Sequence, residues 1–129
     1  MGKLIPDSII DGMLDTIADG VDRIDICKDT PTNYSTATTA GTHSLGSVAV
    51  TTGDGNGDWT IANGDTSGRK LTLAEQTGVS IGNTGTATHI AGTDGSSVLY
   101  FVTTCTSQAV TSGNTATINT FDIEISDAS

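Results

Sequence analysis

The spacing of apolar residues predicts one helix, at the start of the chain. Within "PDSIIDGMLDTIADG" (residues 6–20) the apolar side chains recur at helical intervals and form one stripe, Ile9, Ile10, Met13, Leu14 and Ile17. Asp7 or Ser8 can cap the start, and Asp19-Gly20 can end the helix. Gly12 costs about 1 kcal/mol relative to alanine inside a helix. The helix must therefore gain stability by docking its stripe, either on its own sheet or on a neighbouring subunit.

After Gly20 the apolar period changes from helical to two, which is typical of strands. Gly-containing turns separate the strand candidates at short intervals, and these candidates are residues 22–27, 44–50, 58–62, 69–75, 78–82, 86–92, 97–104 and 115–126. This spacing favours an all-β fold, an antiparallel β-sandwich (immunoglobulin-like or jelly-roll-like) with one N-terminal α-helix. The predicted organisation is a helix over residues 1–20 and a sandwich domain over residues 21–129.

The sequence gives more detailed structural expectations for three segments. Residues 28–42, "KDTPTNYSTATTAGT", have the Pro, Asn, Ser and Gly content of a long loop. The run "SVLYFV" is apolar on both faces, so we expect a central strand covered on both sides. In the last strand Phe121, Ile123 and Ile125 face one way, and the acidic residues between them face the other.

Charge excludes one class of partner. Fifteen acidic and five basic residues give a net charge of −10, and such a surface repels phosphate backbones, so we expect no nucleic acid partner. No stretch approaches the length of a membrane span, and the N-terminus lacks the apolar core of a signal peptide. We therefore expect no membrane association, and synthesis and folding in the cytoplasm.

The stretch "TTGDGNGDWTIANGD" (residues 51–65) spaces oxygen-bearing side chains almost as a calcium loop does, namely Asp54, Asn56, Asp58 and Asp65. However, the sixth position needs Gly and is Trp59, and the twelfth position holds the short Asp65 instead of Glu. The flanks read as strands, with Trp59 in the core. We interpret the stretch as a turn, with calcium as the weaker alternative, and predict no metal or cofactor.

Other candidate chemistry is sparse. His43 and His89 have no metal-ligand spacing around them, and no nucleophile motif is present, so we predict a hydrogen-bonded structural role for His89 and no enzymatic activity. Cys27 and Cys105 are too few for a disulfide framework. Two interpretations stay open for them: burial as small apolar residues, or one disulfide between an early and a late strand.

Two segments of the chain resemble a family of small structural proteins of tailed bacteriophages and prophages. The segments are "DGVDRIDICKDTPTNYSTAT" (residues 19–38) and residues 64–127, with their "GRKLT", "GTATH" and "SQAVTSGNT…FDIEI" motifs. The resemblance implies a virion component made in the bacterial cytoplasm. It brings no catalytic motif and no functional residues with it.

The leading hypothesis is a capsid decoration or cement protein. Its partners would be the major capsid protein and neighbouring copies of itself, in a homo-oligomer or symmetric array. The candidate interface residues are the helix stripe, Ile9, Ile10, Met13, Leu14 and Ile17, together with Pro31 and Tyr34 of the long loop. The alternative is a tail or tail-fibre component that recognises a host saccharide through the Trp59 loop.

Overall fold

The computed structural model describes residues 5–126, and these residues are mainly β-structure. They form three antiparallel sheets and an N-terminal helix, consistent with a sandwich-like fold, so the predicted all-β class is confirmed. The chain divides into two compact units. Unit 1 contains the described residues of Met1–Gly20, Thr51–Glu75 and Asn119–Ser129, and unit 2 contains Val21–Val50 and Gln76–Ile118.

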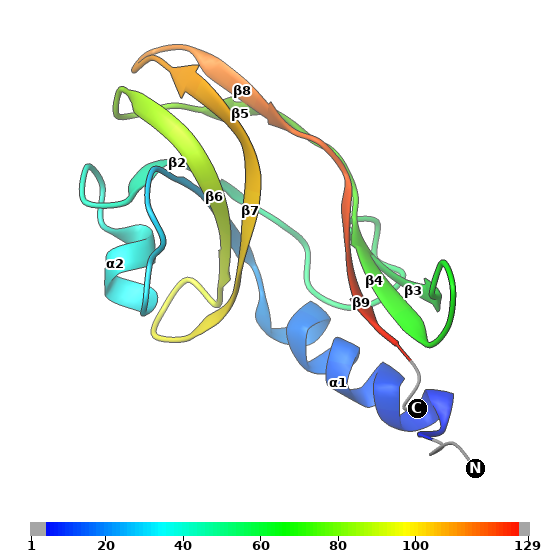
Figure 1. The fold of residues 1–129 in the computed structure, drawn as a ribbon. Coiled ribbons are helices and arrows are strands. Elements are labelled where there is room, and N and C mark those ends of the chain that lie inside the picture. The colour runs from blue at the N-terminus through cyan, green and yellow to red at the C-terminus, as the bar shows by residue number, and fades with distance from the viewer. Residues whose placement is uncertain (1–4, 127–129) are drawn as a thin grey trace. The chain divides into compact units, whose positions relative to one another are not determined.

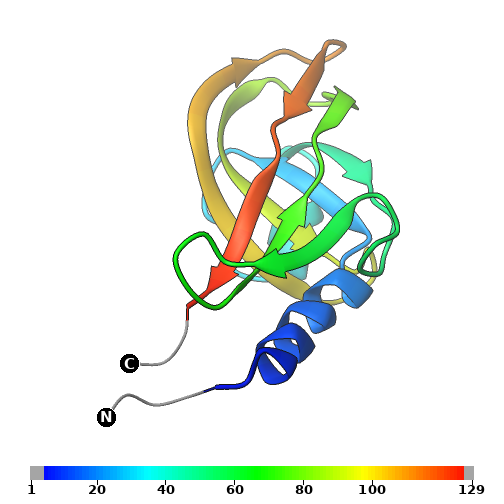
Figure 2. The same ribbon diagram turned by 90° about the vertical axis from the view of Figure 1, so that its right-hand side faces the viewer.

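Unit 1 is one helix packed on a three-stranded antiparallel sheet. The helix α1 spans Asp7–Gly20, and the strands are β3 (Trp59–Asn63), β4 (Arg69–Leu73) and β9 (Phe121–Ile125). The strand order is β3-β4-β9, and α1 contacts β4 and β3 (Figure 2). The predicted helix is confirmed, and in the structure its docking surface is a sheet of the same chain.

The core of unit 1 lies between α1 and this sheet. One side of the helix contributes Ile10, Leu14 and Ala18, which have no exposed surface, and the strands contribute Trp59, Leu71 and Leu73, which have none either. Leu71 and Leu73 alternate with half-buried polar residues, as expected for a sheet with one face more covered than the other. The predicted core position of Trp59 is confirmed.

Unit 2 contains a four-stranded and a two-stranded antiparallel sheet (Figure 1). The larger sheet has the order β2-β1-β6-β7, built from β1 (Arg23–Cys27), β2 (Ser44–Ala49), β6 (Gly85–Thr93) and β7 (Leu99–Val110). The smaller sheet pairs β5 (Gln76–Ser80) with β8 (Thr115–Ile118). The two sheets meet where Gly46 of β2 bridges to Ile81, just after β5. A Cβ atom at Gly46 would collide with the Ser80 carbonyl, so this close approach requires glycine.

The segment predicted as a long loop contains a second helix, so that prediction was wrong. The helix α2 spans Tyr34–Thr38 and begins with a capping box: the Asn33 side chain accepts the Thr36 N–H at 2.9 Å, and the Thr36 hydroxyl accepts the Asn33 N–H at 3.2 Å. Such a short helix has no apolar period to detect. Its stability comes from the cap and from Ala37, which is buried against β1.

Two strand expectations were also wrong. The run "SVLYFV" was expected in a central strand, but β7 lies at the edge of its sheet. The last predicted strand is two strands: β8 pairs with β5 in unit 2, and β9 pairs with β4 in unit 1. The chain changes unit at Asn119-Thr120, where the Thr120 hydroxyl donates to the Leu73 carbonyl at 2.6 Å.

Candidate binding surface

The helix α1 carries a four-residue repeat that the sequence analysis did not recognise. Each repeat is an aspartate, a small residue and two larger apolar residues, except that the last apolar position is Ala18: "DSII", "DGML", "DTIA" and then Asp19-Gly20. Because residues four apart lie on the same side of a helix, the repeat makes separate rows along α1. One apolar row is Ile10, Leu14 and Ala18, and it is buried.

The second apolar row is left on the surface. Ile9 is 58% exposed and Met13 is 44% exposed, while Ile17, the next in the row, is half-buried. Gly12 lies beside them in the middle of the helix, and a Cβ atom there would meet nothing within 4 Å. Within the chain, Gly12 therefore costs helix stability without relieving any close contact.

Three of the predicted interface residues are buried in the structure. Ile10 and Leu14 belong to the core of unit 1, and Pro31 is buried in unit 2, so none of these three side chains is exposed for a partner. Tyr34 is half-buried in the first turn of α2. The sequence analysis treated two rows of α1 as a single stripe. Grouping the apolar residues of the helix at intervals of four would have separated the two rows.

The aspartate row of α1 gives the same unit a strongly acidic side. Asp11 forms an ion pair with Arg69 of β4, with an Oδ1–Nε distance of 2.7 Å. The pKa of the Asp15 carboxyl is raised by partial burial first, and then by the negative charges of Asp19, Asp54 and Asp11. This helix therefore presents exposed apolar side chains and repelling carboxylates within the same few turns.

The loop at residues 51–65 uses its side chains to hold its own backbone. Asp54 Oδ1 accepts the Ile61 N–H at 2.8 Å, Asp58 Oδ2 accepts the Thr51 N–H at 2.6 Å, and Asn56 Nδ2 donates to the Thr52 carbonyl at 2.9 Å. Asp65 forms an ion pair with Lys70 at 2.7 Å. The four calcium candidates are thus engaged in four different contacts. Within residues 5–126, no group of three or more His, Cys, Asp and Glu side chains is placed to hold a metal ion.

Unit 2 contains an ion pair beneath α2 in which the carboxylate is buried and the guanidinium is partly exposed. Asp25 has no exposed surface, and its two carboxylate oxygens accept from Arg23 Nε at 2.8 Å and Arg23 Nη2 at 2.9 Å. The Ser44 hydroxyl donates to Asp25 Oδ2 at 2.6 Å. Arg23 Nη2 also donates to the Thr38 carbonyl at the end of α2, at 3.4 Å. The hydrogen bond to Asp25 raises the pKa of Arg23.

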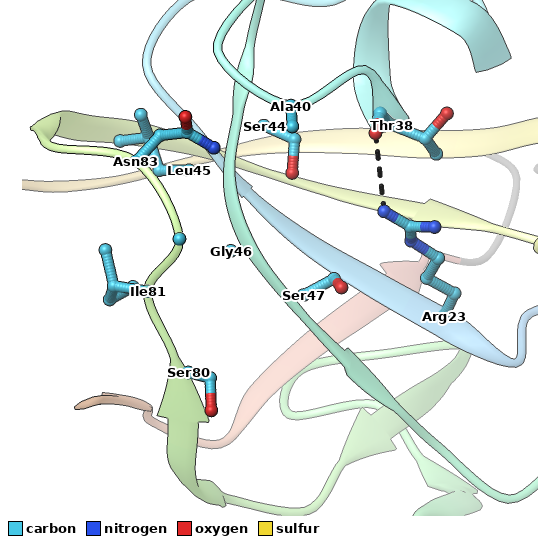
Figure 3. A pocket seen from close by; sticks show the side chains of 11 residues that line it. Arg23, Thr38, Ala40, Ser44, Leu45, Gly46, Ser47, Ser80, Ile81 and Asn83 are labelled. Atoms are coloured by element: carbon cyan, nitrogen blue, oxygen red, sulfur yellow. Dashed lines mark hydrogen bonds between the residues drawn. The ribbon is translucent and has the colours of Figure 1, made fainter. Parts of the chain in front are cut away.

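A shallow groove of about 290 Å³ lies beside this ion pair (Figure 3). Its walls come from β2 and from residues 80–83, and Arg23 lies at one end with its hydrogen bond to Thr38. Because the guanidinium is already paired with Asp25, the groove offers a bound anion little uncompensated charge. We assign this network a structural role in holding α2 on the sheet.

His89 and the two cysteines have structural roles or positions that the structure explains. His89 lies between the hydroxyls of Thr30 and Thr88, at 3.0 and 2.8 Å, which confirms the predicted hydrogen-bonded role. Both cysteines are free, and Cys27 is buried whereas Cys105 is half-buried. Burial, followed by the nearby Asp25 charge, raises the pKa of the Cys27 thiol to about 12, so this thiol is protonated and unreactive at neutral pH.

Comparisons with known proteins add no assignment. No family model, curated protein or solved structure matches the chain. Among the described residues, no helix has the length and apolar character needed to cross a membrane. The strongest surface feature is thus the exposed row of Ile9 and Met13 on the acidic unit.

Proposed function

We propose that the chain is a non-enzymatic structural protein of a tailed-bacteriophage virion, a decoration or cement protein that binds the assembled head shell. Two observations support the proposal. One is the sequence resemblance of residues 19–38 and 64–127 to small phage structural proteins. The other, which carries the proposal, is the exposed apolar row of α1 on a helix that is otherwise firmly docked.

This row is suited to contact with a protein surface. Ile9 and Met13 can contribute apolar burial while α1 stays fixed by Ile10 and Leu14, so binding requires no rearrangement of the helix. The sequence segments of unit 1 contain 11 acidic and three basic residues. A complementary surface on the shell protein would therefore combine apolar side chains with lysine or arginine.

The proposed mechanism is mass action. A protein that binds the assembled, expanded shell but not its free subunits stabilises the shell by its binding free energy. A small stabilisation per copy becomes large when many copies occupy equivalent sites on a symmetric lattice. No chemical step is needed for this activity.

The first test is the copy number in purified particles, measured by quantitative mass spectrometry against the major capsid protein. A decoration protein should be present in near-stoichiometric amounts. A handful of copies per particle would contradict the decoration role and indicate a tail or portal position. Complete absence from particles would contradict any virion role.

The second test concerns the surface itself. We expect the Ile9→Ser/Met13→Ser double variant to bind empty expanded shells about 10- to 30-fold more weakly, because each half-exposed side chain contributes about 1 kcal/mol when it is buried. Val98→Ser is the matched control, since Val98 is 43% exposed but lies in unit 2. Co-sedimentation with shells measures both, and equal binding by the double variant and wild type would refute the role of α1.

The saccharide-recognition alternative has lost its proposed contact residue. Trp59 has no exposed surface, so its indole ring is not available to stack on a sugar. The acidic side chains of the same loop hold backbone N–H groups instead. We therefore do not propose this alternative.

A further inference from the structure

The chain contains the tripeptide Asn-Gly-Asp twice, at residues 56–58 and at residues 63–65. Deamidation is chemically easiest where glycine follows asparagine, because glycine has no side chain to hinder attack by its own backbone nitrogen. Both copies belong to unit 1, and both asparagines are exposed. The local sequence therefore treats the two sites alike, and any difference in their reactivity must come from their surroundings in the fold.

In the second copy, contacts hold both reacting groups. The Gly64 N–H, which would have to attack, donates to the Gly68 carbonyl at 2.9 Å. The Asn63 side-chain oxygen accepts from Arg69 Nη1 at 2.7 Å, and the backbone of Asn63 pairs with Arg69 at the end of β3. A Cβ atom at Gly64 would collide with the Ser67 carbonyl, so the backbone is closely packed there. Asn63 can react with the Gly64 nitrogen only if these contacts break.

In the first copy, the glycine lacks such restraints. Within residues 5–126, the Gly57 N–H donates to no acceptor, and a Cβ atom at Gly57 would meet nothing within 4 Å. Both Asn56 and Gly57 are exposed. Asn56 Nδ2 donates to the Thr52 carbonyl at 2.9 Å, and this is the nitrogen that leaves during deamidation. The attacking nitrogen of this copy is therefore not engaged in a hydrogen bond that must first break.

We propose that Asn56 is a site of spontaneous deamidation, with Gly57 as the attacking residue and water as the co-reactant. The Gly57 nitrogen bonds to Asn56 Cγ, its proton passes through solvent to Nδ2, and the Cγ–Nδ2 bond breaks. Ammonia leaves, and a cyclic succinimide remains. Water then opens the ring at either carbonyl and gives aspartate or isoaspartate at this position. No electrons are transferred, and the chain gains one negative charge.

The reaction removes an anchor of the loop beside the end of α1. The hydrogen bond from Asn56 to Thr52 is lost, because a carboxylate cannot donate. The Asn56 side chain lies against Gly53, and the Gly53 N–H donates to the Ala18 carbonyl in the last turn of α1, at 2.8 Å. The helix dipole disfavours a new negative charge at this end of the helix. Deamidation should therefore loosen the contact between the loop and α1.

The test compares the two copies within one protein. The purified full chain is incubated in mildly alkaline buffer, and peptide mapping by mass spectrometry follows each Asn-Gly site over time. In the folded chain Asn56 should deamidate at least about fivefold faster than Asn63, the rate factor that corresponds to one net hydrogen bond. In concentrated urea the two rates should agree within about twofold, because unfolding removes the contacts of both sites.

A matched pair of variants identifies the site by charge. Anion-exchange chromatography should show a more acidic form that accumulates in the wild type and in Asn63→Gln. The same form should not accumulate in Asn56→Gln, because glutamine would have to close a larger and less favourable ring. In the separated acidic form of the wild type, the Gly53 amide should exchange hydrogen faster than in the unmodified chain.

Three outcomes would overturn the deamidation site: a rate at Asn63 that equals or exceeds the rate at Asn56 in the folded chain, a difference that persists in urea, or an acidic form that Asn56→Gln does not abolish. Unchanged exchange of the Gly53 amide would overturn the loosening of the loop. All of these measurements use the isolated chain, so their result does not depend on shell binding.

Discussion

Asp25 lies in surroundings that differ from those that its sequence position indicates. In "DRIDIC" it alternates with Ile24 and Ile26, and a half-buried strand would place it in water. Instead both faces of β1 are buried, because α2 covers the face that carries Asp25 and Cys27. A buried carboxylate is tolerated only with partners, and Asp25 has two, Arg23 and Ser44.

Removal of the carboxylate charge should therefore destabilise unit 2. We expect Asp25→Asn to lower the free energy of unfolding by about 3 kcal/mol, the low end for a broken buried pair, because the Arg23 side chain is 32% exposed and can turn to solvent. Ser44→Ala removes a single hydrogen bond and should cost about 1 kcal/mol. Urea denaturation of both variants measures the difference, and equal losses would contradict a dominant role for the ion pair.

At the scale of elements, α1 carries one buried and one exposed apolar row. The row of Ile10 and Leu14 fixes the helix on the sheet, and the row of Ile9 and Met13 stays on the surface. The two rows are adjacent in sequence, so neighbouring residues of similar size and helix propensity should lose very different amounts of stability on substitution by alanine.

Leu14 and Met13 provide the direct comparison. Leu14→Ala should cost about 2–4 kcal/mol of stability, because it empties a fully buried position. Met13→Ala should change stability by less than about 0.5 kcal/mol, because the side chain is 44% exposed and alanine favours the helix. Thermal unfolding measures both, and a large loss for Met13→Ala would show that this row is also part of the core.

Sequence patterns predicted long, regular elements better than short or composite ones. The helix over residues 6–20 was predicted because its apolar period is sustained for three to four turns, and most strands were predicted from alternation and glycine turns. α2 was missed because five residues held by a cap carry no period. The break at Asn119-Thr120 was missed although the apolar positions change phase there, from Ala116 and Ile118 to Phe121 and Ile123, where the pairing partner changes from β5 to β4.

The candidate surface was predictable only in part. The apolar residues of α1 were identified, but the division between its buried and exposed rows depends on the direction from which the β3-β4 sheet packs, which the sequence does not specify. The apolar run in β7 led to the wrong expectation of a central strand covered on both sides. Its edge position follows from the strand order, which local patterns do not contain.

For the whole molecule, the uneven distribution of charge is the main electrostatic feature. Of fifteen acidic residues, eleven belong to the segments of unit 1, and three of its described carboxylates lie close enough to Asp15 to raise the pKa of that residue. Unit 2 is nearly neutral by comparison. Repulsion should therefore lower stability within unit 1.

Asp15 tests this repulsion, and the sign follows from its raised pKa. Between pH 3.8 and the raised pKa the folded chain binds more protons than the unfolded chain, so the free energy of unfolding falls as the pH rises through that interval, and the loss persists at neutral pH. Asp15→Asn should therefore stabilise the protein at pH 7, by less than about 1 kcal/mol because the site is largely solvated. The gain should disappear below pH 3.8, and it should shrink in high salt.

Asp7→Asn is the matched control: it removes an acid from the first turn of α1, where the helix dipole favours negative charge, and should cost about 0.3–1 kcal/mol. Chemical denaturation at several pH values measures both variants, and a loss of stability for Asp15→Asn at pH 7 would contradict repulsion within unit 1.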